Sequence, residues 1–79
     1  MKDGLIPLYL LPIGSIAKVK RLDAHGNTRR RMLDLGLIVD TQVEAMQKSP
    51  SGDPIAYQIR GAVIALRSEE ASKIFVEAI

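Results

Sequence analysis

The sequence contains no cysteine and no tryptophan, one histidine, two tyrosines and one phenylalanine. Without cysteine the chain has neither a disulfide nor a cysteine-based zinc site, which fits a reducing cytoplasm. A catalytic nucleophile and its base would have to be built around His25, the single histidine. Few aromatic rings are available for a proline-rich peptide groove or for stacking on single-stranded nucleic acid. These absences argue against an enzyme, an aromatic peptide groove and a single-strand reader.

The sequence also lacks a long hydrophobic run, and spanning a bilayer takes about 20 apolar residues. The nearest candidate, Leu5–Gly14, is broken by Pro7 and Pro12. A signal peptide would begin with a net basic segment, whereas Lys2 is offset by Asp3. We therefore expect a cytoplasmic protein without direct membrane insertion.

What the chain does have is enough apolar material for one core. It is 79 residues long and 47% hydrophobic, which suits a single small domain. We expect one domain over residues 1–79, in which residues 1–7 form an N-terminal extension.

Alternation of apolar and polar residues predicts several short strands. Gly14–Leu22 alternates in this way, and Lys18 and Lys20 point away from the core. Thr41–Gln47 and Ile55–Ile59 show the same period of two. Each of these three stretches is expected to bury one face.

The C-terminal part of the chain reads as a hairpin, a cover and a closing strand. Ala62–Leu66 is apolar on both faces, so we expect it to be covered on both sides. Gly61 suits the tight turn before it, since Arg60 should resist a positive φ. A helix over Ser68–Phe75 would supply the cover, and Val76–Ile79 would close the sheet.

A second short helix is predicted in the middle of the chain. Thr28 is its expected N-cap, and Gly36 is the residue just past its last turn. Leu37 follows where a Schellman end places its apolar contact. The apolar side of this helix consists of Met32, Leu33 and Leu35.

The predicted elements sum to five short strands and two short helices. This is an all-β class, a small and partly open SH3-like barrel. We expect Tyr57 and Phe75 to face the core, which removes them from any surface groove.

Charge is distributed unevenly although the net charge is +2. Residues 1–39 hold seven Lys or Arg against three acids, and residues 40–79 hold four against six. Such asymmetry hints at an anionic partner, but it also occurs where charges merely solvate a small protein. At about 100° per residue, Arg29 and Arg31 diverge, so at most two adjacent arginines can face one partner. The predicted partner-binding residues are Lys18, Lys20, Arg29, Arg30 and Arg31.

Candidate catalytic and metal groups are sparse. Asp23 and His25 could point together, but two ligands in a polar loop do not make a metal site. Glu69 and Glu70 are adjacent on a predicted helix, so their carboxylates diverge. We predict no catalytic residues, no metal ligands and no cofactor.

Several stretches, in one order, resemble a known family. They are RRRMLDLGL, TQVEA, SGDPIAY and RGAVIALRSEEASKI, and they extend over roughly Leu8–Ala78. In this order they resemble the FeoA family, small cytoplasmic SH3-like proteins of bacterial ferrous-iron uptake. The parts that carry the resemblance best are Leu35, Gly36 and Leu37 at the helix end, Gly52, Asp53 and Pro54 in a turn, and Leu66-Arg67 followed by Glu70-Ala71.

The resemblance implies an accessory of a large membrane permease for ferrous iron that carries a cytoplasmic G-protein domain. It implies no small-molecule substrate. The family usually has Pro-Gly before the strand that begins near Thr41, whereas this chain has Val39-Asp40. The alternative is an SH3-like nucleic-acid-binding or iron-repressor-type regulatory domain, because the fold also resembles the C-terminal domain of iron-dependent repressors. The absence of a helix-turn-helix and of stacking aromatics argues against that alternative.

Overall fold

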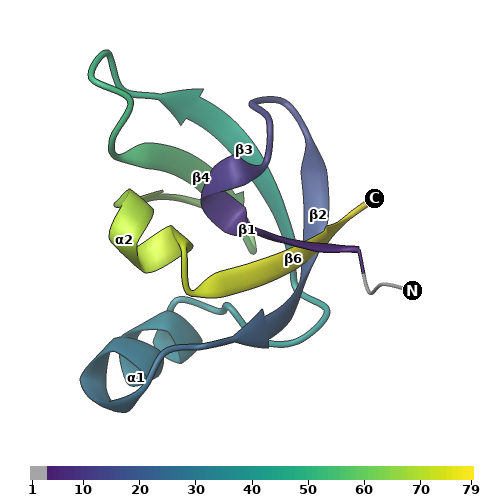
Figure 1. Cartoon of the computed structure of the whole chain (residues 1–79), viewed down its shortest axis with the longest axis vertical. Coiled ribbons are helices and arrows are strands. Elements are labelled where there is room, and N and C mark those ends of the chain that lie inside the picture. The colour runs from purple at the N-terminus through teal and green to yellow at the C-terminus, as the bar shows by residue number, and fades with distance from the viewer. Residues whose placement is uncertain (1–3) are drawn as a thin grey trace.

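A computed structural model describes residues 4–79 as one antiparallel sheet curled into a partly open barrel (Figure 1), with strand order β1-β6-β2-β3-β4-β5. The strands are β1 (Leu5–Pro7), β2 (Ile16–Leu22), β3 (Gln42–Lys48), β4 (Ile55–Ile59), β5 (Ala62–Leu66) and β6 (Ile74–Ala78). The helices are a 3-10 helix (Leu8–Leu10), α1 (Gly26–Asp34) and α2 (Ser68–Ala71). No helix within residues 4–79 is long and apolar enough to span a bilayer. The predicted class, mostly β with two short α-helices, is confirmed.

The core lies inside the curled sheet and is apolar throughout the described residues. Tyr57 sits in it as predicted, fully buried, and its hydroxyl donates a 3.4 Å hydrogen bond to the carbonyl oxygen of Leu8. Burial raises the pKa of Tyr57 to about 12. The other large, fully buried side chains include Leu8, Met32, Leu37, Ile59, Leu66 and Ile74.

A sixth strand, β1, was not predicted. It lies in the segment expected to be an N-terminal extension, and it pairs antiparallel with β6 from Leu5 opposite Glu77 to Pro7 opposite Phe75. The strand is too short for an alternation signal, and Pro7 can occupy a strand end because it donates no ladder hydrogen bond. Residues 1–3 of the predicted extension lie outside the described residues.

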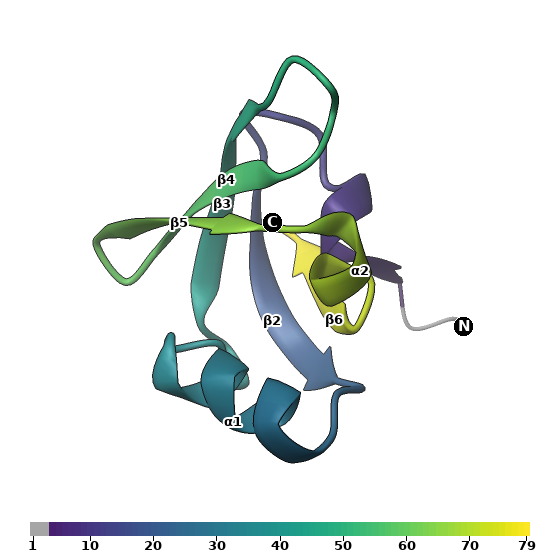
Figure 2. The ribbon, with the colours of Figure 1, turned by 90° about the vertical axis from the view of Figure 1, so that its left-hand side faces the viewer.

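The expectation that Ala62–Leu66 is covered on both faces is wrong. β5 is an edge of the sheet and pairs with β4 alone (Figure 2). Leu66 is buried, whereas Val63 is 65% exposed and Ala65 is also exposed. In this molecule the strand that is apolar on both faces, β5, is therefore an uncovered edge strand and not a central one.

The predicted helix over Ser68–Phe75 is also wrong in length. α2 stops at Ala71, and Ile74 already begins β6. The helix start is fixed by Asp53, whose Oδ1 accepts a 2.7 Å hydrogen bond from the backbone N–H of Ser68. Pairing of β6 with both β1 and β2 outweighs the helical pattern of this segment.

Phe75 does not face the core as predicted. Its neighbours Ile74 and Val76 are buried, so strand alternation turns Phe75 to the opposite side of β6. There the guanidinium of Arg21 lies 4.4 Å from the centre of the ring. This cation–π contact covers a ring that would otherwise be solvated.

α1 begins earlier than predicted and ends where predicted. Its first residue is Gly26 and the preceding residue makes no side-chain cap, so Thr28 is not the N-cap. At the other end the N–H of Leu37 donates to the carbonyl of Met32, and the N–H of Gly36 donates to that of Leu33, both at 3.0 Å. These two bonds are the Schellman motif, which confirms the predicted helix end.

Candidate functional site

The three arginines of α1 point to different partners. Arg29 Nη1 donates a 3.2 Å hydrogen bond to the carbonyl oxygen of Leu22. Arg31 Nη1 is ion-paired with the carboxylate of Glu70 in α2. Arg30 is exposed and makes no hydrogen bond or ion pair within residues 4–79. The structure thus separates the arginines around the helix, as the helical angle requires.

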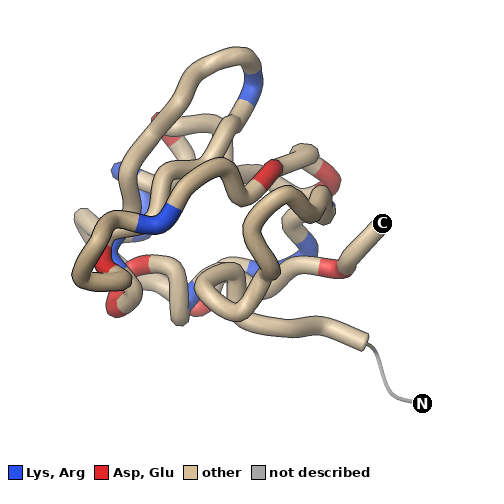
Figure 3. Tube along the Cα trace, turned by 90° about the horizontal axis from the view of Figure 1, so that it is seen from above, with Lys and Arg blue, Asp and Glu red and all other residues tan. Residues whose placement is uncertain are grey.

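The lysines of β2 also differ from each other. Lys20 Nζ lies 2.7 Å from Asp40 Oδ1 and 3.9 Å from Glu77 Oε1, whereas Lys18 is exposed and has no ion pair among the described residues. Figure 3 shows Lys and Arg positions interleaved with Asp and Glu along the trace. Of the five predicted partner-binding residues, Lys20 and Arg31 are therefore ion-paired within the chain, and Arg30 and Lys18 carry charges that are open to a partner.

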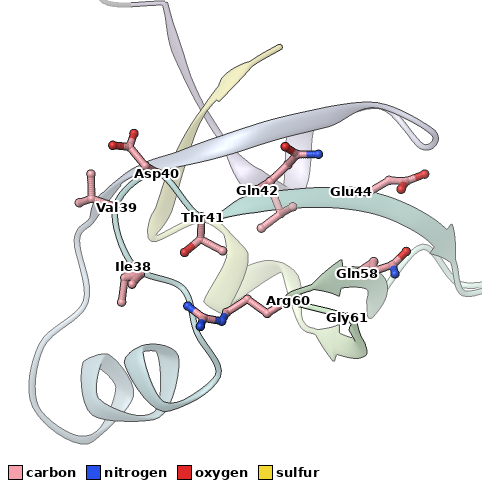
Figure 4. Close-up of a pocket in the computed structure, with 10 residues that line it drawn as sticks. Ile38, Val39, Asp40, Thr41, Gln42, Glu44, Gln58, Arg60 and Gly61 are labelled. Atoms are coloured by element: carbon pink, nitrogen blue, oxygen red, sulfur yellow. The ribbon is translucent and has the colours of Figure 1, made fainter.

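A groove of about 600 Å³ lies between the turn after α1 and the hairpin that joins β4 to β5 (Figure 4). One wall is the segment from Ile38 to Glu44, and the other is formed by Gln58, Arg60 and Gly61. The two walls come from segments about twenty positions apart in sequence.

The first wall depends on the turn that contains Val39-Asp40. The N–H of Thr41 donates to the carbonyl of Ile38 at 3.0 Å, and Asp40 stands third in this four-residue turn with φ 73°. Turns with a left-handed third residue favour glycine or asparagine there, and aspartate tolerates the position better than most residues. The N–H of Asp40 also donates a 2.6 Å hydrogen bond to the carbonyl of Val19, which ties the turn to β2.

The ion pair of Asp40 with Lys20 holds the same turn to β2. The hydrogen bond from Lys20, together with its charge, lowers the pKa of Asp40, and Asp40 in the same way raises the pKa of Lys20. Each partner therefore stabilises the charged form of the other. Lys20 is used here to position the groove wall.

The second wall contains a feature that sequence reasoning judged wrongly. Arg60 was expected to resist positive φ, but it adopts 52°, followed by Gly61 at 84°. Its side chain extends from the hairpin towards Ile38 and the end of α1 (Figure 4). A Cβ atom on Gly36 would lie 2.4 Å from Arg60 Cδ. Gly36, at φ 94°, therefore supplies both the left-handed backbone and the space for the Arg60 stem.

The groove combines the open cation of Arg60 with the carboxylates of Asp40 and Glu44, polar amides and apolar side chains. Arg60 makes no ion pair within residues 4–79, and Gln58 and Thr41 line the groove near it. Ile38 is 45% exposed and Val39 is 63% exposed at its rim. Within this groove Arg60 can pair with a carboxylate of a partner, and Ile38 and Val39 can contact apolar side chains beside it. The prediction missed Ile38, Val39 and Arg60, although two apolar residues in a turn were a usable signal.

The remaining candidate groups have structural explanations. Asp23 is ion-paired with Arg21 at 2.9 Å. Within residues 4–79 no three His, Asp or Glu side chains are grouped as metal ligands would be. The Gly52-Asp53-Pro54 turn acts through Asp53, which fixes the start of α2.

Comparison with known proteins places this geometry in a family. The family model described as the FeoA domain matches residues 6–78. A fusion protein of Fe(2+) transport protein A and the Fe(2+) transporter FeoB, from Porphyromonas gingivalis, is 35% identical over 69 residues. That match covers 87% of this chain and 8% of the fusion protein, so the chain spans less than a tenth of that relative.

Solved structures agree with the family assignment. A FeoA-like protein from Clostridium acetobutylicum superposes with a TM-score of 0.89 at 35% identity, covering 99% of this chain and 91% of that one. A FeoA protein from Stenotrophomonas maltophilia, described as a prokaryotic SH3 domain protein and solved with zinc, gives 0.77 at 32% identity over 89% and 87% of the two chains. The SH3-like barrel is therefore the shared fold, and the chain belongs to the FeoA family.

Proposed function

We propose that this chain is a cytoplasmic accessory protein of bacterial ferrous-iron uptake, which binds a membrane iron permease at its cytoplasmic G-protein domain and modulates it. The observation that supports this most directly is the relative in which the corresponding domain and the transporter FeoB are one polypeptide. Covalent linkage keeps two modules at a high effective concentration, which is useful when they bind each other.

The surface we propose for docking is the groove together with Arg30. Arg60 and Arg30 carry charges without partners among the described residues, and Ile38 and Val39 add exposed apolar area. Interfaces of this kind rely on a few apolar and arginine contacts, with other charges at the rim. A partly apolar segment of the permease that places a carboxylate at Arg60 or Arg30 would complement this surface.

Modulation then follows from differential affinity. A protein that binds one state of the G-protein domain more tightly than the other shifts that domain towards the bound state. Lys20 and Arg31 contribute indirectly under this proposal, since they hold the turn after α1 and the contact between α1 and α2. Lys18 and Arg29 are additional exposed cations under this proposal.

The test is a titration of the full chain against the purified G-protein domain of the permease, with and without guanine nucleotide. Arg30→Glu should weaken binding about tenfold or more, or about 1.4 kcal/mol. Lys48→Glu is its matched control, because Lys48 is also exposed, has no ion pair among residues 4–79 and changes the net charge equally. Equal losses in the two variants would mean a nonspecific charge effect and would overturn the proposed surface.

The apolar part of the groove has its own matched pair. Ile38 and Ile13 are 45% and 46% exposed and lie in different parts of the chain. Ile38→Ser should weaken binding, whereas Ile13→Ser should leave it unchanged. A chain that fails to bind the G-protein domain in every nucleotide state would refute the function itself. Salt-dependent binding to duplex DNA in its place would favour the regulatory-domain alternative.

A further inference from the structure

β5 leaves one side of its backbone unpaired at the edge of the sheet. Its five residues pair with β4 in register from Ile59 opposite Ala62 to Ile55 opposite Leu66. No other strand in residues 4–79 pairs with it. A free strand edge of this kind is a template for another strand.

The hairpin geometry identifies which backbone groups point outward. A two-residue turn, Arg60-Gly61, is closed by a hydrogen-bonded pair, here Ile59 and Ala62. Backbone groups alternate in direction along β5. The N–H and C=O groups of Ile64 therefore also point to β4, whereas those of Val63 and Ala65 point away from the sheet. No hydrogen bond involving these outward groups occurs within the described residues.

This edge also lacks the features that prevent edge pairing. Natural edges are protected by proline, by charged side chains, by bulges or by shortness. β1, at the opposite edge, has three residues and ends in Pro7. β5 has five apolar residues, no proline, no charge and a regular register with β4. Val63, which is 65% exposed, would be partly covered by a neighbouring strand on pairing.

We propose that β5 pairs antiparallel with β5 of a second copy of this chain, about a two-fold axis at Ile64. In this register Val63 of each copy lies opposite Ala65 of the other, and Ala62 lies opposite Leu66. The outward groups of Val63 and Ala65 then exchange both N–H···O bonds at each of two sites. The proposal stands apart from permease binding, because it requires only this chain.

A second copy of this chain is the proposed partner because β5 is complementary to itself. Shifting the register by one residue in each copy would leave part of β5 unpaired, whereas the register centred on Ile64 pairs all five residues. That register also sets Arg60 opposite Ser68 and Arg67 opposite Gly61, so that like charges do not stand directly opposite each other. A two-fold interface needs this kind of matching of a surface with itself.

The expected dimer is weak. Two edges of five residues bury much less than the roughly 1,200 Å² of a stable interface. Sedimentation velocity should therefore show monomer at about 10 µM and a rising dimer fraction towards about 1 mM, the range of weak association. Amide exchange at high concentration should slow at Val63 and Ala65, whose N–H groups are unpaired in the monomer.

Two variants test the geometry. Val63→Lys places a charge on the edge, and Ala65→Pro removes an outward N–H without removing a bond to β4. Each should raise the dissociation constant at least about tenfold. Val39→Lys is the control, since Val39 is 63% exposed and lies in the turn after α1. Monomer throughout the concentration range, or a dimer that neither edge variant weakens, would overturn the proposal.

Discussion

At its C-terminal end α1 is fixed by buried contacts, whereas the middle of the helix presents arginines to solvent. Met32 and Leu37 are fully buried and are joined by the Schellman hydrogen bond. Arg30, two residues before Met32, is exposed and touches no partner among residues 4–79. The end of this short helix is therefore needed for folding, whereas Arg30 is free of contacts within the described residues and can bind a partner.

The difference shows how packing assigns roles that composition does not. Arg31 lies in the last turn of α1, where the helix dipole favours a cation, and it is ion-paired with Glu70. Arg29 donates a hydrogen bond to the carbonyl of Leu22. Arg30 has no partner among the described residues, which is the physical reason for assigning it to an external partner.

The largest effect should come from the buried end. Leu37→Ala should lower the free energy of unfolding by about 2–5 kcal/mol, because it empties a fully buried site. Arg30→Ala should change it by no more than about 0.5 kcal/mol. Urea denaturation followed by circular dichroism measures both, and Leu33→Ala, at a 39% exposed position, is the control for the loss of a leucine. Similar losses of unfolding free energy for Leu37→Ala and Leu33→Ala would contradict the contrast between buried and exposed positions.

A smaller effect is expected at the helix stop. Gly36→Ala should cost about 1–2 kcal/mol from the left-handed backbone alone. An additional cost arises because Arg60 Cδ lies 2.4 Å from the new Cβ position. In an Arg60→Ala background the substitution should therefore cost less. A double-mutant cycle in urea measures this coupling, and identical costs in both backgrounds would show that the Arg60 stem does not constrain Gly36.

The smallest effect on stability is expected for the ion pair between Lys20 and Asp40, which holds the turn after α1. The pKa of Asp40 is lowered in the folded state by Lys20. The ion pair therefore adds to the stability of the fold above the pKa that Asp40 has in the unfolded chain, near 3.8. This stabilisation is lost as the pH falls through the lower pKa that Asp40 has in the folded protein. Asp40→Asn keeps a residue that tolerates positive φ and removes the charge. The stability difference between wild type and this variant should shrink below about pH 4 in acid titrations, and a difference that does not change there would contradict the pairing.

Much of the fold could be predicted because it depends on local patterns. The alternation in β2, β3 and β4 and the Gly36-Leu37 helix end each involve residues close in sequence, so their signals survive in a single sequence. The length of α2 could not be predicted, because β6 competes for its last residues through pairing with β1 and β2. The exposure of β5 depends on the absence of a neighbouring strand, which no local pattern records.

None of the predicted partner-binding residues lines the candidate groove. The arginines and lysines were named from their charge, and the structure shows which of them the chain itself neutralises. The groove was missed because its walls are brought together by the turn at Asp40 and the hairpin at Arg60, two positions where non-glycine residues adopt positive φ. A glycine at either position would have indicated a left-handed turn in the sequence, but both positions carry other residues.

By itself the sequence determined the class of fold, the buried face of most strands and the end of α1, because hydrophobic period and turn chemistry act over a few residues. The family resemblance was likewise present in the order of its motifs. The tertiary structure alone decided which charges remain open, where the groove lies and which strand edge is left unpaired. These properties depend on contacts between residues far apart in the chain, and burial and ion pairing are set only when the sheet closes around its core.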